Sequence, residues 1–451
     1  MKSLLNKILH EKNIQSIFTN GSVAAINLLS FLILVRMLNT QEYGIWVIVI
    51  SASTMLDMLR FGFTRTALTH YISSGSEDQI RKHKGSGFAI DLSGGAILFF
   101  VMIILFPFLK GVDMDAFSYL LIYYPFLAIA NAPWNNALSI LQAQQKFDLI
   151  LVLKLSVFGL FLISILGINY LFVPNFKNVM IAFILANLIA SFIAIVFKWT
   201  GAQSLKYITK NSIGKLIHYG KYTVLTNVGS SLLKSADTLI IGLMPVMGAT
   251  AAAIYAIPLK VIELIQIPIN GFVATAIPKL SKAFLENKFA VFLKTLYTYT
   301  GAVLFSLVPV IILLFIFSKQ ILLLLSGDQY VQYLPTMMPV MYLFLIYGLL
   351  LPIDRFTGVA LDSAELPQLN AIKVQIMLAL NIIGDLVAVF LFESLIMVAF
   401  VTLLFTLVGI FIGWHFLITK FKFEPNQIIK EGIKFYSRNV NMEALKKLIV
   451  K

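Results

Sequence analysis

The chain has 451 residues, of which 59% are apolar and only 12% are charged, and its net charge is +14. Soluble domains carry about 25% charged residues, so this composition indicates a protein surrounded largely by lipid. The lack of cysteine excludes disulfide frameworks and thiolate metal sites, and the five histidines are scattered singly along the chain. We therefore expect neither a metal nor a cofactor. Basic residues of a membrane protein gather on its cytoplasmic loops, so the positive charge does not indicate nucleic acid as a partner.

The N-terminal residues 1–15 interleave charged and apolar residues and lack the uninterrupted apolar core of a signal peptide. We interpret them as an amphipathic helix that leads into the membrane. A spanning helix needs about 20 mostly apolar residues, and the sequence contains twelve such segments in two groups of six. The predicted helices are 14–38, 43–69, 86–109, 115–141, 149–170 and 177–199, then 215–244, 249–277, 290–318, 336–361, 368–392 and 395–419.

Lysine and arginine are distributed unevenly between alternate loops. If the N-terminus is cytoplasmic, the cytoplasmic stretches hold most of the basic residues, with Lys373 and a basic tail among them. The opposite side holds only Arg36, Lys110, Lys177 and Lys319. This positive-inside pattern supports the helix count and predicts that both termini lie in the cytoplasm.

The two groups of helices resemble each other. The segment FGFTRTALTHYIS at 61–73 aligns without a gap to NGFVATAIPKLSK at 270–282. Six helices return the chain to its starting side, so the repeats must be parallel, and transporters built in this way place the substrate between their halves. We therefore predict an all-α integral membrane protein of twelve transmembrane helices in two parallel six-helix lobes. The predicted lobes are 1–200 and 215–419, followed by a basic amphipathic cytoplasmic tail at 420–451.

Charged residues inside the predicted helices are few and mostly paired. Three acid–base pairs have i,i+3 spacing: Asp57 with Arg60, Lys234 with Asp237, and Lys260 with Glu263. That spacing puts both groups on one helical face, so each pair can neutralise itself while presenting both signs to a cavity. Charges at membrane depth usually face a cavity or a partner.

These charges suggest two kinds of site. The cations are candidates for binding an anionic substrate such as a phosphate or pyrophosphate: Arg60, Arg65, Lys234, Lys260 and Arg355. The acids are candidates for binding a coupling proton or sodium ion: Asp57, Asp237, Glu263, Asp91 and Asp385. Asp91 and Asp385 have no close basic neighbour in their helices, which suits a titrating group. The alternative for each pair is a structural ion pair that locks helices together.

Three stretches resemble a known family. Residues 33–73 combine an Arg-x-Leu helix end, the turn Glu42-Tyr43-Gly44 and a Gly-containing helix end, and SADTLIIGLM and AAAIYAIPLKVIEL follow in the second half. In these stretches the sequence resembles the Wzx-type polysaccharide flippases of the multidrug/oligosaccharidyl-lipid/polysaccharide (MOP) exporter superfamily. Within that resemblance Asp237 matches a recurrent acid of the seventh helix, whereas Arg36 and the Glu-Tyr-Gly turn match residues that shape an outer turn.

The resemblance implies a twelve-helix transporter and not an enzyme. It implies ion-coupled translocation of undecaprenyl-pyrophosphate-linked oligosaccharide repeat units, as for O-antigen lipopolysaccharide or capsule. Membrane lipids and the polysaccharide polymerase machinery are the partners expected in addition to this lipid-linked oligosaccharide.

Other functions stay open at this stage. A cation-coupled multidrug antiporter of the same superfamily shares twelve helices, although a cavity with at least as many bases as acids argues against cationic substrates. A lipid II flippase of that superfamily generally has two additional helices, for which this chain has no room. A membrane oligosaccharide polymerase or ligase, from a different class, has a sizeable outer loop, and all predicted outer loops here are short.

Overall fold

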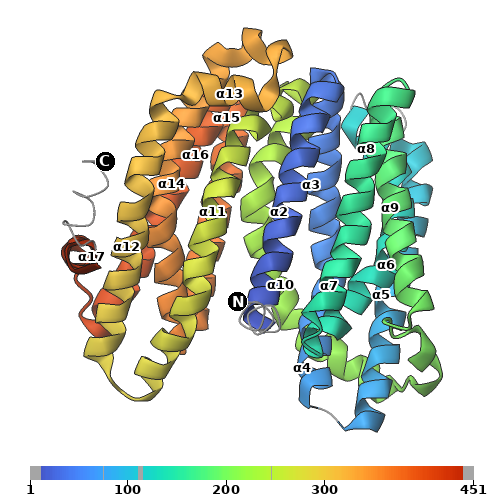
Figure 1. The fold of residues 1–451 in the computed structure, drawn as a ribbon, viewed down its shortest axis with the longest axis horizontal. Coiled ribbons are helices and arrows are strands. Elements are labelled where there is room, and N and C mark those ends of the chain that lie inside the picture. The colour runs from blue at the N-terminus through green and yellow to red at the C-terminus, as the bar shows by residue number, and fades with distance from the viewer. Residues whose placement is uncertain (1–11, 75, 110–114, 245, 440–451) are drawn as a thin grey trace, which may run out of the picture. The chain divides into compact units, whose positions relative to one another are not determined.

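The computed structural model describes residues 12–74, 76–109, 115–244 and 246–439. Within these ranges the regular structure is entirely helical, and no strand occurs. The predicted all-α class is therefore confirmed. Contacts divide the chain into two compact units, residues 1–253 and 254–451 (Figure 1). Their boundary differs from that of the six-helix lobes expected from the sequence, which stay a prediction.

Unit 1 contains the helices up to α10 and the first turn of α11. In chain order these are α2 (Lys12–Met37), α3 (Thr40–Gly62), α4 (Arg65–Ser74), α5 (Glu77–Leu109), α6 (Asp115–Ala143), α7 (Phe147–Lys154), the π-helix η1 (Leu155–Gly159), α8 (Leu160–Leu171), α9 (Phe176–Val196), the 3-10 helix η2 (Ala202–Tyr207) and α10 (Lys210–Leu243). The main neighbours of α6 are α5 and α9, and α10 packs along α3.

Unit 2 contains the remainder of α11 and the helices that follow it. These are α11 (Gly248–Leu285), α12 (Phe289–Ile316), α13 (Ser318–Ser326), the 3-10 helix η3 (Asp328–Tyr333), α14 (Leu334–Ser363), α15 (Pro367–Phe390), α16 (Leu395–Phe421) and α17 (Asn426–Asn439). α16 packs against both α14 and α15, and α12 packs against α14 and α17.

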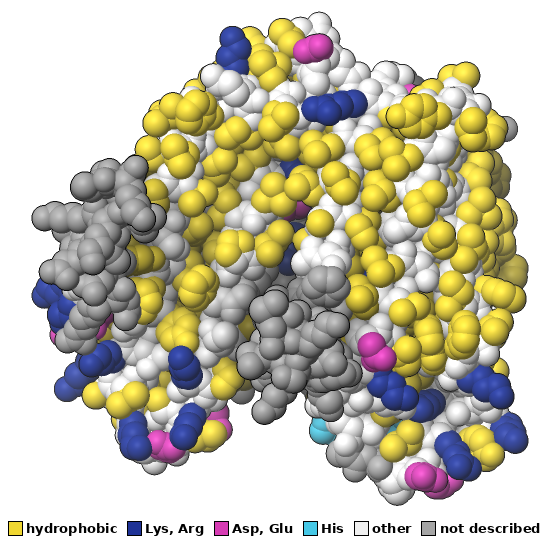
Figure 2. All heavy atoms as spheres, viewed as in Figure 1, with side chains coloured by type: hydrophobic (Ala, Val, Ile, Leu, Met, Phe, Trp, Pro, Cys, Tyr) yellow, Lys and Arg dark blue, Asp and Glu magenta, His cyan; other side chains and the backbone are white. Residues whose placement is uncertain are grey.

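Eleven helical stretches of the described chain are long and apolar enough to cross a bilayer. α10, which corresponds to the predicted seventh helix, is not among them, and it carries Lys215, Lys221, Lys234 and Asp237. With α10 included, the arrangement is consistent with twelve helices. Apolar side chains cover much of the outer surface of unit 1 (Figure 2). Phe192, for example, is 68% exposed. The protein is therefore a multi-pass membrane protein.

Two predicted helices are interrupted. The helix expected at 43–69 is divided into α3 and α4, with a break at Phe63 and Thr64. The helix expected at 149–170 contains the wider turn η1 between α7 and α8. The apolar pattern runs through both interruptions, which is why hydropathy alone did not locate them.

Lys373 is buried and does not lie in a loop. It is 2% exposed in α15, and its Nζ lies 2.6 Å from Asp354 Oδ1 on α14. It belongs to α15, which begins at Pro367, and Asp354 supplies the opposite charge. Its predicted place on the cytoplasmic side stays a prediction. An ion pair of this kind offsets the large desolvation penalty of a buried ammonium group.

The C-terminal helix α17 packs against α12. A Cβ added at Gly301 would lie only 2.3 Å from the backbone oxygen of Ile428, and the Tyr436 hydroxyl donates a hydrogen bond to Ala302 O at 2.9 Å. The outer side of α17 carries the exposed apolar residues Ile429 and Ile433. This part of the predicted tail is thus an amphipathic helix, whereas residues 440–451 and the predicted N-terminal segment up to residue 11 lie outside the described residues.

We expect Gly301→Ala to separate α17 from α12, because the added methyl group has no room against the backbone of Ile428. Limited trypsin digestion of the purified protein should then cleave after Lys430 and Lys434 at least about fivefold faster than in the wild type. Gly271→Ala is the matched control, since nothing lies within 4 Å of an added Cβ there. Equal digestion rates for both variants would contradict the docking of α17.

Candidate functional site

The site begins with an ion pair on α3. Asn39 caps this helix by accepting a hydrogen bond from the backbone N–H of Glu42 at 2.8 Å, as its position before the first turn favours. Along the helix, Arg60 Nη2 lies 3.0 Å from Asp57 Oδ1. The predicted i,i+3 pair is therefore present, with both partners largely withdrawn from solvent at 3% and 22% side-chain exposure.

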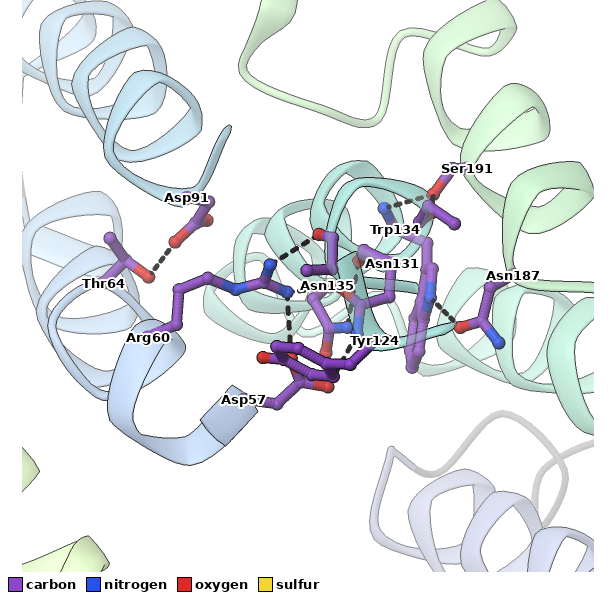
Figure 3. Close-up of polar contacts among 12 residues, drawn as sticks. Asp57, Arg60, Thr64, Asp91, Tyr124, Asn131, Trp134, Asn135, Asn187 and Ser191 are labelled. Atoms are coloured by element: carbon purple, nitrogen blue, oxygen red, sulfur yellow. Dashed lines mark hydrogen bonds and ion pairs between the residues drawn. The ribbon is translucent and has the colours of Figure 1, made fainter. Parts of the chain in front are cut away.

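The Arg60 guanidinium is bound inside unit 1 (Figure 3). Besides Asp57, it donates to the backbone oxygen of Ala128 at 2.5 Å and to the side-chain oxygen of Asn131, both on α6. It also lies 4.2 Å from the centroid of the Phe61 ring. These contacts join α3 to α6 and leave Arg60 outside the lining of the cavity described below. They favour a positioning role for this residue.

Glycines of α5 make room for Arg60. A Cβ at Gly94 would lie 3.0 Å from Arg60 Cγ, and one at Gly95 would lie 2.9 Å from Arg60 Nη1. These two glycines end the cluster GSGFAIDLSGG at 85–95 of α5, and their lack of side chains leaves the space that Arg60 occupies. This packing lets a long cationic side chain pass between three helices.

Asp57 is held by residues of α6 as well. The Tyr124 hydroxyl donates to its Oδ1 at 3.0 Å, and the Asn131 side-chain amide donates to its Oδ2 at 2.6 Å. With Arg60, three side chains therefore fix the orientation of one carboxylate. Figure 3 shows this carboxylate and the amide of Asn131 converging from two helices.

A cavity of about 700 Å³ lies beside this network in unit 1. Its lining comes from α3, α4, α6, η1, α9 and α10. Three residues proposed from the sequence face it: Asp57, Arg65 and Lys234. The lining also holds four side-chain amides and several aromatic rings: Asn131, Asn135, Gln142, Asn187, Trp134, Phe61, Phe158 and Phe183.

Trp134 is fixed in the cavity wall. Its indole N–H donates to Asn187 Oδ1 at 2.8 Å, and its backbone N–H donates to Ser191 Oγ at 3.2 Å. Both partners are on α9, so the ring position is set by two helices. A fixed aromatic face beside amides that both donate and accept hydrogen bonds suits a ligand with hydroxyl groups and C–H faces, such as a sugar.

Sequence reasoning missed the amides and Trp134. The run Asn-Ala-Pro-Trp-Asn-Asn at 131–136 interrupts the apolar sequence of α6 with three asparagines and an indole. Polar side chains in the middle of a spanning helix usually face a cavity or a neighbouring helix. This run was the signal that could have located the cavity wall.

Asp91 is a buried carboxylate at the break between α3 and α4. It is 1% exposed, accepts a hydrogen bond from the Thr64 hydroxyl, and accepts another from the Asn136 amide at 2.9 Å. It forms no ion pair among the described residues. Asp91 therefore ties α5 to α6 and to the interruption of the second predicted helix.

The other predicted site residues lie elsewhere. Asp237 is buried in α10 and does not line the cavity. In unit 2, Lys260 and Glu263 form the predicted i,i+3 pair at 2.7 Å, and Arg355 is half-buried on α14. Asp385 is fully buried in α15, where it accepts a hydrogen bond from the Asn381 amide at 3.0 Å. Within the described chain, no three His, Asp or Glu side chains gather as they would around a metal ion.

Removing Arg60 should destabilise unit 1, because Asp57 would keep a buried charge without its counterion. We expect Arg60→Met to lower the free energy of unfolding by about 3–5 kcal/mol and the double variant Asp57→Asn/Arg60→Met to lose much less. Thermal denaturation in detergent measures both. Arg65→Met, which removes an exposed cation nearby, should change stability by less than about 0.5 kcal/mol. A milder effect of Arg60→Met than of Arg65→Met would refute the positioning role.

Comparisons with known proteins agree with this architecture. The chain resembles the inward-facing structure of a multidrug resistance MATE family transporter of the MOP superfamily, with a TM-score of 0.74, 13% identity, and coverage of 90% of this chain and 99% of that one. It also resembles the lipid II flippase MurJ, with a TM-score of 0.70, 15% identity, and coverage of 93% and 90%. These identities indicate a shared fold.

A MOP superfamily transporter from Pyrococcus furiosus is similar as well, with a TM-score of 0.55, 12% identity, and coverage of 92% of this chain and 93% of that one. No curated protein sequence matches significantly. The family model described as "Polysaccharide biosynthesis protein" matches residues 11–284, which is more than half of the chain. The chain therefore belongs to the polysaccharide biosynthesis protein family, and it shares its fold with the MATE transporter and with MurJ.

Proposed function

We propose that this protein is a flippase that moves undecaprenyl-pyrophosphate-linked oligosaccharide repeat units across the bacterial inner membrane for the synthesis of a surface polysaccharide such as O-antigen or capsule. One observation carries the proposal: in the cavity of unit 1, the cations Arg65 and Lys234 share a wall with four amides and the fixed ring of Trp134. Such a substrate joins an anionic pyrophosphate to a polar glycan. The cavity offers a matching group for each part.

The charge balance of the cavity favours an anion over a cationic drug. Among the described residues of the lining, Asp57 is the one acidic side chain, and it is already paired with Arg60 at 3.0 Å. Arg65 and Lys234 also line the cavity, so its described wall carries two cationic side chains and one carboxylate. A multidrug antiporter that binds cationic drugs would need more acidic than basic side chains in its cavity.

The mechanism proposed here is alternating access by two six-helix lobes, 1–200 and 215–419, with both chain termini in the cytoplasm. The internal repeat and the uneven distribution of lysine support this arrangement. The cations Lys260 and Arg355 of unit 2 are proposed to take part in substrate binding, as is Arg60 indirectly through Asp57 and Asn131. Polysaccharide polymerase machinery is the expected consumer of the exported units.

Ion coupling is part of the proposal, and Asp91 is the favoured carboxylate. It combines complete burial with two neutral hydrogen-bond donors, and it contacts Thr64 at the break between α3 and α4. Binding of a proton or a sodium ion to Asp91 would therefore act on a point where the helix can bend. Asp57, Asp237, Glu263 and Asp385 are the remaining candidates.

For coupling, we expect Asp91→Asn to abolish the response of substrate translocation to an imposed proton or sodium gradient in proteoliposomes, because an amide does not titrate. Substrate binding should be retained, which separates coupling from folding. Glu286→Gln, at an exposed position where α11 has ended, is the control. Gradient-driven translocation at the wild-type rate by Asp91→Asn would exclude this carboxylate.

The function itself is tested by deleting the gene and locating the lipid-linked oligosaccharide with a membrane-impermeant sugar probe, in intact and in opened cells. We expect single repeat units to accumulate on the cytoplasmic leaflet. Normal arrival at the outer leaflet would reject the flippase. Normal polymerisation would then favour a drug antiporter, and defective polymerisation would favour a polymerase or ligase.

Complementation of the deletion strain tests the cavity. Lys234→Ala and Trp134→Ala should each reduce export by about tenfold or more at equal protein abundance, since each removes a group that faces the ligand. Lys260→Ala should also reduce export if unit 2 contributes to binding. Lys206→Ala, an exposed lysine of η2 outside the cavity, should export normally. Wild-type export from both Lys234→Ala and Trp134→Ala would contradict the proposed binding site.

A further inference from the structure

A second, smaller cavity adjoins the first in unit 1. Its volume is about 170 Å³, compared with about 700 Å³ for the large cavity, which suits a small anionic group and not an oligosaccharide. Arg65 and Gln142 line both cavities, so the two cavities share part of their walls. The other polar lining residues are Thr19, Asn20 and Lys154, from α2 and α7.

The small cavity is cationic. Arg65 and Lys154 face it, and none of the described residues that line it is acidic. In the part of the chain that the structure describes, neither cation forms an ion pair. Because both line the same small cavity, their like charges repel each other. An anion placed between them would relieve that repulsion and form charge-assisted hydrogen bonds with both.

Lys154 is held in position toward this space. Its Nζ donates a hydrogen bond to Asn20 Oδ1 at 3.1 Å, and the neighbouring Thr19 is buried at 2% exposure. The amide of Gln142 adds donors from α6. Cations from two helices, with amides from two others, therefore surround a volume that only a small ligand can fill.

Both cations lie at irregularities of their helices. Arg65 is the first residue of α4, directly after the break at Phe63 and Thr64. Lys154 is the last residue of α7, directly before the π-helical turn η1, and Phe158 of η1 lines the large cavity. π-helical turns within α-helices often occur at functional sites. The backbone is thus irregular at the two points that bring positive charge to this small space.

We propose that the small cavity between α2, α4, α6 and α7 binds the pyrophosphate group of the lipid-linked substrate, with Arg65 and Lys154 as its ligands and Asn20 as a positioning residue, while the glycan occupies the large cavity. This inference rests on the proposed function and adds the subsite that binds the anionic part of the substrate. It assigns a binding role to Lys154, which no sequence pattern singled out. It also separates Lys234, which faces only the large cavity, from the anion site.

Binding of inorganic pyrophosphate to the full-length protein in detergent, followed by isothermal titration calorimetry, tests the subsite. We expect Lys154→Gln and Arg65→Gln each to weaken pyrophosphate binding by about tenfold or more, as for a lost charge-assisted hydrogen bond. Asn20→Ala keeps both cations and should weaken binding by about threefold. Lys146→Gln, an exposed lysine at the start of α7 outside both cavities, and Lys234→Gln should bind within about twofold of the wild type.

Three results would overturn the proposal: no pyrophosphate binding by the wild type, wild-type affinity of Lys154→Gln, or equal weakening by Lys234→Gln. If Lys154→Gln does not fold, Lys154→Arg keeps the charge and should retain binding, and its loss of binding would count against the site. Competition by phosphatidylglycerol vesicles as effective as that by a short-chain prenyl pyrophosphate would identify a lipid headgroup site instead.

Export in cells separates this inference from the proposed function. Loss of export in Lys234→Ala and Trp134→Ala together with normal export in Lys154→Gln would leave the flippase standing and remove the subsite. Normal arrival of lipid-linked units at the outer leaflet in the deletion strain would remove the flippase, whatever the variants do to pyrophosphate binding.

Discussion

The burial of the Arg60 guanidinium is the interaction on which the wall of the cavity depends. A charged group at membrane depth has to find its partners within the protein, because lipid supplies none. Arg60 finds a carboxylate on its own helix and a carbonyl and an amide on α6, and it reaches them across the glycines of α5. Three helices are therefore fixed relative to one another at one point. The orientation of Asp57 and Asn131 toward the cavity follows from that point.

This arrangement divides the cations of unit 1 into two kinds. The positive charge of Arg60 is already matched inside the protein, so it stabilises the site without being available to a ligand. Arg65 and Lys154 form no ion pair among the described residues, and together with Lys234 they line the two cavities. In the sequence Arg60 and Arg65 look equivalent, since both follow Asp57 within one apolar segment. What distinguishes them is a helix break and the glycines of α5, neither of which the pattern around them contains.

The predictable part of the fold is the part that hydropathy determines. The observed helices agree with the predicted segments because apolar length decides whether a segment can span, and the i,i+3 pairs Asp57–Arg60 and Lys260–Glu263 formed because helical spacing alone brings them together. Contacts between helices were not predictable in this way. Lys373 found its partner Asp354 on another helix, and Trp134 found Asn187 and Ser191 on α9. Each of these partners depends on tertiary packing that no local spacing encodes.

The two interruptions that the sequence pattern hid have a common physical reason. Backbone that departs from the α-helix at membrane depth leaves polar groups to be satisfied, and this is tolerated where the backbone lies inside protein or lines a polar cavity. The break before Arg65 is contacted by Asp91 through Thr64, and the turn η1 after Lys154 borders the large cavity. Irregular backbone, buried polar partners and available cations therefore coincide in one region of unit 1. A site that binds a charged group within the membrane needs irregular backbone, buried polar partners and cations together. Straight apolar helices can neither orient cations toward a ligand nor stabilise their charge.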